Sequence, residues 1–170
     1  MSSRALPDHD EPLPTLEGRA LCFGLELDAA QILGPAAAHD TPDDACRHLF
    51  ATVDPDLAGR LAADDVIVAE EIAGTPETAR PALAALAAAG VRALVARQFA
   101  SDIMSAAQAY GIVTLVVEAP SFLRTHDRVR LDLDAGKVVN LSSGDRAAIC
   151  KFADDERARL RAALAHRRLR

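Results

Sequence analysis

Residues 70–99 read EEIAGTPETARPALAALAAAGVRALVARQF, and this stretch decides the fold class. An apolar strand ends in Ala-Gly-Thr, a helix rich in alanine and leucine follows, and a second apolar strand closes the segment. Thr75 is a typical N-cap, Pro76 suits the first helical position, and Glu77 faces the positive end of the helix. Gly90 ends the helix. Strand, helix and strand in this order predict two parallel strands joined by a right-handed crossover.

The same alternation continues on both sides of this stretch. Strands are expected at 65–69, 92–97 and 113–118, with helices between them. This pattern predicts an α/β fold with a mostly parallel sheet and helices on both faces. Farther along, VRLDLDAGKVVNLSSG alternates with period two around Ala135 and Gly136, which predicts a C-terminal β-hairpin.

Length and composition limit the organisation of the chain. It has 170 residues, half of them apolar, which is enough for one domain with a sizeable core. We expect a single domain over residues 17–170. Residues 1–16 are rich in proline and acidic side chains and have no continuous apolar segment, so we expect a disordered lead-in rather than a signal peptide.

Charge and cysteine usage exclude several classes of protein. The formal charge of -6 argues against general binding to nucleic acid, which needs a basic surface. No apolar run approaches the roughly 20 residues of a membrane span. Cys22, Cys46 and Cys150 are isolated, which fits a reducing cytoplasm and does not resemble the spacing of zinc or iron–sulfur ligands. We therefore expect a cytoplasmic protein without a metal site of its own.

Two features carry possible chemistry. The free N–H groups of a helix that starts at Thr75 could bind a carboxylate or phosphate, although Glu77 would oppose an anion unless it is protonated or acts as a base. Judged by these residues alone, a plain helix cap is the commoner situation. His39, beside Asp40 in a loop, is either a solvated histidine or a catalytic one, and the solvated histidine is commoner. The sequence contains no P-loop, GxGxxG, HExxH or GxSxG motif.

Several segments in order resemble one known family. GRALCFGLELDAAQILGP is similar to G-x-A-x-x-F-G-D-N-I-D-T-D-x-I-I-P, AAAGVRALVARQFA to A-A-G-V-x-A-V-I-A-x-S-F-A, and DLDAGKVVNLSSG to D-L-x-T-G-x-I-x-N-L-T-T-G. These motifs belong to the small subunit of 3-isopropylmalate dehydratase, which is the swivel domain of the aconitase superfamily. The resemblance covers about residues 18–152.

The resemblance implies a swivelling α/β domain that docks over a separate large subunit. In that family the large subunit carries a 4Fe-4S cluster, and this chain is expected to hold no cofactor. A small hydroxy-carboxylate substrate lies in the cleft between the subunits and is dehydrated and rehydrated. The cluster acts as a Lewis acid on the hydroxyl group. The small subunit contributes a base serine and carboxylate-binding groups in a G-S-S-R-E-H turn.

Aligned without a gap, that turn falls on GTPETAR. Glu77 takes the place of the base serine, Thr78 that of the second serine and Ala79 that of the arginine, with Arg80 one position late. Through the resemblance, Glu77 is the expected base.

The expected substrate-binding residues come from the same turn and from two other places. Asp28 remains from D-N-I-D-T-D, and His39 lies in the region that sets specificity in the isopropylmalate enzymes. The expected substrate-binding set is Thr75, Thr78, Arg80, Asp28 and His39.

Two functions follow from this pattern. In the first, the chain is the small subunit of an aconitase-superfamily hydro-lyase, inactive alone, and acts on a hydroxy-carboxylic acid. In the second, it is a non-catalytic swivel-like module that binds or stabilises a partner protein. The altered turn favours the module, and retention of the whole scaffold favours the enzyme subunit.

Overall fold

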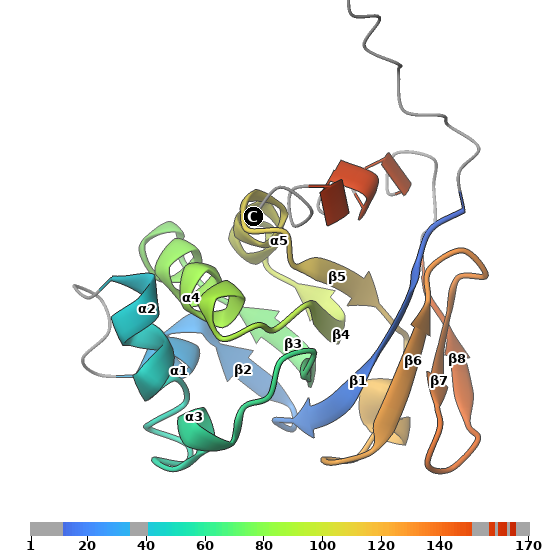
Figure 1. Cartoon of the computed structure of the whole chain (residues 1–170), viewed down its shortest axis with the longest axis horizontal. Helices are drawn as coiled ribbons and strands as arrows, with labels where there is room; N and C mark the ends of the chain where they lie inside the picture. The colour runs from blue at the N-terminus through green and yellow to red at the C-terminus, as the bar shows by residue number, and fades with distance from the viewer. Residues whose placement is uncertain (1–11, 35–40, 151–156, 159, 163, 166–170) are drawn as a thin grey trace, which may run out of the picture.

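The computed structural model describes residues 12–34 and 41–150, and residues 157, 158, 160–162, 164 and 165 near the C-terminus. The described strands form one sheet in the order β5-β4-β3-β1-β6-β7-β8, with β2 paired to β3 (Figure 1). The strands are β1 (Thr15–Cys22), β2 (Glu26–Asp28), β3 (Val66–Ala73), β4 (Ala93–Phe99), β5 (Val113–Val116), β6 (Arg128–Asp132), β7 (Lys137–Asn140) and β8 (Arg146–Ala148). The named helices are α1 (Ala29–Leu33), α2 (Pro42–Ala45), α3 (Leu57–Arg60), α4 (Pro76–Ala88) and α5 (Ser101–Ala109), with short 3-10 turns η2 (Cys46–His48) and η3 (Pro120–Phe122).

One half of the sheet is parallel and carries the helices. β3 pairs in parallel with β1, β2 and β4, and β4 pairs in parallel with β5. The chain passes from β1 to β3, then to β4 and then to β5, always towards the same edge of the sheet. Because crossovers between parallel strands are right-handed, the connecting helices all lie on one face. The buried side chains of α1, α4 and α5 accordingly share a core cluster with Ile67 of β3 and Leu94 of β4.

The other half is antiparallel and covers the opposite face. β1 pairs with β6, β6 with β7 and β7 with β8, and these strands stand together on the far side of β1 from α4 (Figure 1). A second core cluster joins Val68 of β3 and Val95 of β4 to Val129 and Leu131 of β6. The sheet therefore curls, so that its antiparallel strands lie over the face that α1, α4 and α5 leave open.

A β-bulge connects β1 to β2 along the side of β3. Cys22 pairs with Val68 and Glu26 pairs with Glu71, so the β1–β2 side has one more residue than β3 between these two pairs. Gly24 lies in the bulge with φ 77°, a conformation that favours glycine. The bulge carries the chain on to β2 and brings the end of β2 beside the end of β3.

The α/β fold class and the C-terminal hairpin are confirmed, and some details differ from our expectation. β1 begins at Thr15, so the boundary expected at residue 17 lies inside a strand, while residues 1–11 of the expected lead-in lie outside the described residues. The sheet is mixed, because β6, β7 and β8 are antiparallel. On the face of the second cluster, the described helical residues are Leu160 and Leu164 near the C-terminus, and Phe122 of η3 also packs there.

Candidate functional site

The carboxyl ends of β2, β3 and β4 meet at one edge of the sheet, where ligands of parallel α/β sheets commonly bind. Asp28, the last residue of β2, pairs with Ala73, the last residue of β3. The amide of Ala100, just after β4, donates to the carbonyl of Ile72 at 3.0 Å. The starts of α1, α4 and α5 are therefore gathered at this edge, and the turn singled out by the sequence lies among them.

Gly74 lies where α1, α5 and the end of β3 approach one another. A Cβ atom added at Gly74 would stand 2.9 Å from the Cβ atom of Ala29 and 3.0 Å from Cδ1 of Ile103. The turn that leads into α4 therefore packs directly against the first residue of α1 and the first turn of α5. Glycine is required here by the close approach of neighbouring elements.

The two threonines of the turn cap α4. The Thr75 amide donates to Oγ1 of Thr78 at 3.0 Å, and the two Oγ1 atoms lie 3.1 Å apart. This is the reciprocal arrangement of a capping box, with threonine in place of the usual glutamate at the third helical position. The structure brings Thr75 and Thr78 together and gives both hydroxyl groups a structural partner.

Glu77 and Ala79 occupy opposite sides of the first turns of α4. Glu77 is exposed, and its carboxylate has no hydrogen bond or ion pair with the described residues. Ala79, at the position of the family's arginine, is completely buried in the core cluster on the helix side of the sheet. The turn thus leaves one acidic side chain open to a ligand, and a buried methyl group stands where the family has its cation.

Asp28 serves as the N-cap of α1. Its Oδ1 accepts from the Ala30 amide at 2.8 Å, and its own amide donates to Oε1 of Gln31 at 2.9 Å. The carboxylate is beside the Ala73 end of β3, so the structure places Asp28 next to the turn. His39 lies in residues 35–40, which are outside the described residues.

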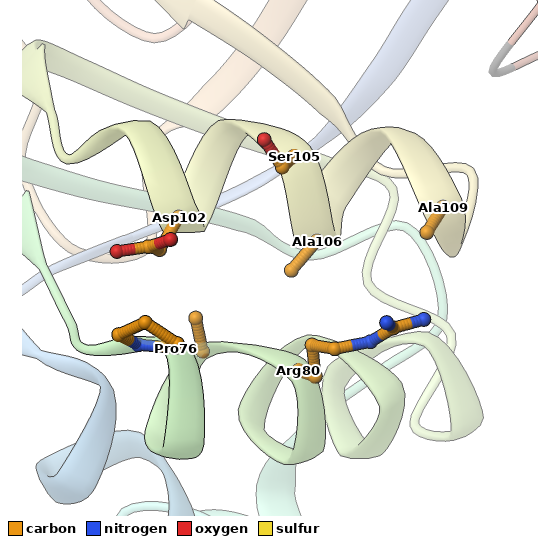
Figure 2. A pocket seen from close by; sticks show the side chains of 7 residues that line it. Pro76, Arg80, Asp102, Ser105, Ala106 and Ala109 are labelled. Atoms are coloured by element: carbon orange, nitrogen blue, oxygen red, sulfur yellow. The ribbon is translucent and has the colours of Figure 1, made fainter.

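Arg80 lies away from the capped turn, in a groove between α4 and α5 of about 270 Å³. Figure 2 shows its side chain running along α4 away from Pro76 and towards the Ala109 end of α5. The same figure shows the carboxylate of Asp102, in the first turn of α5, at the Pro76 end of the groove. The structure therefore separates Arg80 from the two threonines and adds Asp102, which sequence reasoning missed.

The part of the chain that the structure describes has no grouping of side chains suited to an iron–sulfur cluster. Among the described residues, which include all three cysteines, no three His, Cys, Asp or Glu side chains are grouped as metal ligands. Burial raises the pKa of the Cys22 thiol above its usual range, the Thr125 side chain lowers it in part, and the charge of Asp127 raises it. A thiol held in its protonated form is a poor metal ligand. We therefore assign no step of the chemistry to a metal held by this chain.

Solved structures place the fold in a known class. The crystal structure of 3-isopropylmalate dehydratase (LeuD) from Methanocaldococcus jannaschii matches with a TM-score of 0.78 and 24% identity, and the match covers 92% of this chain and 96% of that one. The aconitase X structure from Thermococcus kodakaraensis matches with a TM-score of 0.54 and 16% identity, and it covers 82% of this chain and 93% of that one. The chain therefore has the α/β fold of these two structures.

Sequence comparison identifies the family. A 3-isopropylmalate dehydratase small subunit from Moorella thermoacetica is 30% identical over 81% of this chain and 84% of that protein. Another, from Halothermothrix orenii, is 32% identical over 72% and 76%. A methanogen homoaconitase small subunit from Methanocaldococcus jannaschii is 28% identical over 73% of each chain. No family model matches the sequence. The chain belongs to the family of 3-isopropylmalate dehydratase small subunits, as its motifs predicted.

Among the helices that the structure describes, none combines the length and the apolar character needed to cross a bilayer.

Proposed function

We propose that this chain is the small, swivel subunit of a hydro-lyase that dehydrates and rehydrates a hydroxy-carboxylic acid. The cleft would form between the carboxyl edge of its sheet and a separate large subunit in the cytoplasm. The observation that carries this proposal is the similarity to proteins named small subunits, which in one of them extends over 81% of this chain. A chain that retains the whole swivel fold is most simply explained by docking onto a second subunit.

The large subunit would carry the 4Fe-4S cluster, which supplies Lewis acidity towards the substrate hydroxyl when it is present. In this proposal Glu77 takes the proton from the substrate, because its carboxylate is exposed and has no partner among the described residues. Asp28, Thr75, Thr78, Arg80 and His39 are the proposed substrate-binding residues. A base must stand within hydrogen-bond reach of the proton it removes, so the partner subunit has to bring the substrate to the start of α4.

A non-catalytic module that binds or stabilises a partner is the second candidate. Three polar side chains at the edge already have structural partners: Asp28 caps α1, and Thr75 and Thr78 cap α4. The buried Ala79 removes the expected cation from the turn. Under this alternative the edge retains the shape of a swivel domain and has lost the groups that bind substrate.

The Glu77→Gln variant distinguishes the two candidates. The change preserves shape and removes the base, so turnover of the complex assembled with the large subunit should fall by about 100-fold or more. The thermal midpoint should change little. Asp43→Asn is the matched control, because Asp43 also follows an N1 proline, in α2, and lies outside the turn.

Unchanged turnover in Glu77→Gln would remove Glu77 from the chemistry. In that case Glu77 would act only on the helix dipole, and its neutralisation should cost about 0.3–1 kcal/mol of stability. Turnover and the free energy of unfolding are therefore measured on the same preparations.

A further inference from the structure

The groove between α4 and α5 combines one carboxylate, one guanidinium and an apolar floor. Its lining is Pro76, Ala79, Arg80, Asp102, Ser105, Ala106 and Ala109. Ala79 and Ala106 are buried, while Arg80 is exposed and Asp102 is half-buried. Figure 2 shows the two charged groups towards opposite ends of the groove. The described structure gives neither side chain a hydrogen bond or an ion pair, so both charges are open to a ligand.

We propose that this groove binds a small hydroxy-monocarboxylate, with its carboxylate on Arg80 and its hydroxyl group donating to Asp102. The hydroxyl part of the assignment rests on the proposed function. Among the lining residues there is one cation, so the groove accommodates one ligand carboxylate. An ionised carboxylate such as Asp102 only accepts hydrogen bonds, which selects a ligand group that donates one.

The size and reach of the groove suit a small molecule. Its volume of about 270 Å³ lies below the range of pockets that hold drug-sized ligands. Arg80 is four residues beyond Pro76, which is about 6 Å along the helix. The arginine side chain is exposed and long, so its guanidinium can turn back towards the Asp102 end when a short hydroxy acid binds.

The presence of an acidic residue at position 102 could also be explained by helix stability. A test therefore has to distinguish this structural role of Asp102 from a role in ligand binding. An acidic residue in the first turn of a helix stabilises the positive end of the helix dipole. That role needs no particular direction of the side chain. Asp102 instead lines the groove, and Figure 2 shows its carboxylate at the end of the groove where Pro76 of the facing helix lies. A ligand-binding role therefore predicts an effect on affinity, whereas a structural role predicts an effect on stability alone.

The test is an NMR titration of the isotope-labelled full chain with 3-hydroxybutanoate, following the amides of Ala79 and Ala106. We expect saturable shifts at these groove amides. Asp102→Asn and Arg80→Gln should each weaken binding about tenfold or more, because each removes a charge-assisted hydrogen bond. Asp43→Asn, in the first turn of α2 and outside the groove, should bind like the unchanged chain.

A comparison of two ligands provides a second test, which does not depend on the stability of a variant protein. Butanoate, which lacks the hydroxyl group, should bind about tenfold more weakly, and Asp102→Asn should not weaken its binding further. Absence of shifts at the groove amides, or equal binding of both acids, would overturn the inference. Because the titration uses the chain alone, its outcome is separate from the proposed function. If the chain binds the hydroxy acid in the groove but the assembled complex is inactive, only the proposed enzyme role is contradicted. If the complex is active but the groove binds no hydroxy acid, only the proposed binding site in the groove is contradicted.

Discussion

At the scale of single residues, the carboxyl edge is built mainly to hold helix starts in place. Asp28 caps α1, and Thr75 and Thr78 cap α4, so these polar groups first of all replace missing backbone hydrogen bonds. Glu77 and Asp102 differ, because neither carboxylate has a partner among the described residues. If the edge binds a ligand, these two acids are the side chains that respond to it most directly.

Gly74 is the residue on which the geometry of the turn depends. We expect Gly74→Ala to destabilise the protein by about 1–3 kcal/mol, because the new methyl group would overlap Ala29 and Ile103. The free energy of unfolding in denaturant measures this effect. Gly59→Ala is the matched control, since nothing lies within 4 Å of a Cβ atom there. Equal stability of the two variants would contradict the tight packing at Gly74.

At the scale of elements, the NLSSG segment (140–144), which is similar to the family's N-L-T-T-G, closes the antiparallel half of the sheet. Asn140, 1% exposed at the end of β7, donates to Asp127 at 2.6 Å and to the Phe122 carbonyl at 3.3 Å. Its Oδ1 accepts from the amides of Ser142 and Ser143 at 2.9 and 3.1 Å. This motif therefore serves the fold, and its match says little about catalysis.

The Asn140→Asp variant tests that role. The change replaces a buried donor by a carboxylate that faces Asp127, so we expect a loss of at least about 1–3 kcal/mol at pH 7. Part of the loss should be recovered in acid, where protonation removes the repulsion between the two carboxylates. Thermal unfolding at several pH values measures it, with Ser121→Ala as an exposed control expected within about 0.5 kcal/mol. A loss that does not depend on pH would contradict the contact with Asp127.

Local sequence signals predicted the elements that local chemistry determines. Thr75 and Pro76 placed the start of α4 correctly, and the alternation around Gly136 placed the hairpin. The start of β1 at Thr15 was missed, because this end of the strand is held by antiparallel pairing with β6, more than a hundred residues away in the chain. Asp102 was also missed because its position depends on contacts between distant parts of the chain. The groove that it lines forms only when α4 and α5 pack together, which the local sequence does not show.

At the scale of the whole molecule, the curled sheet leaves the carboxyl edge as the place where α1, α4 and α5 all begin. The helices α1, α4 and α5 cover one face and the antiparallel strands cover the other (Figure 1), and Thr75 and Glu77 at this edge are exposed. The similarity to named small subunits extends over the same scaffold. The central claim is therefore that this chain completes an active site together with a large subunit.

The most direct measurement is the rate of hydroxy-acid dehydration by a purified, cluster-bearing large subunit, with and without this chain. We expect no turnover by either protein alone, and turnover that rises with added chain until it saturates at a stoichiometric amount. A large subunit that is active with another small subunit of the family, and that binds this chain without gaining activity on any hydroxy-carboxylate supplied, would contradict it.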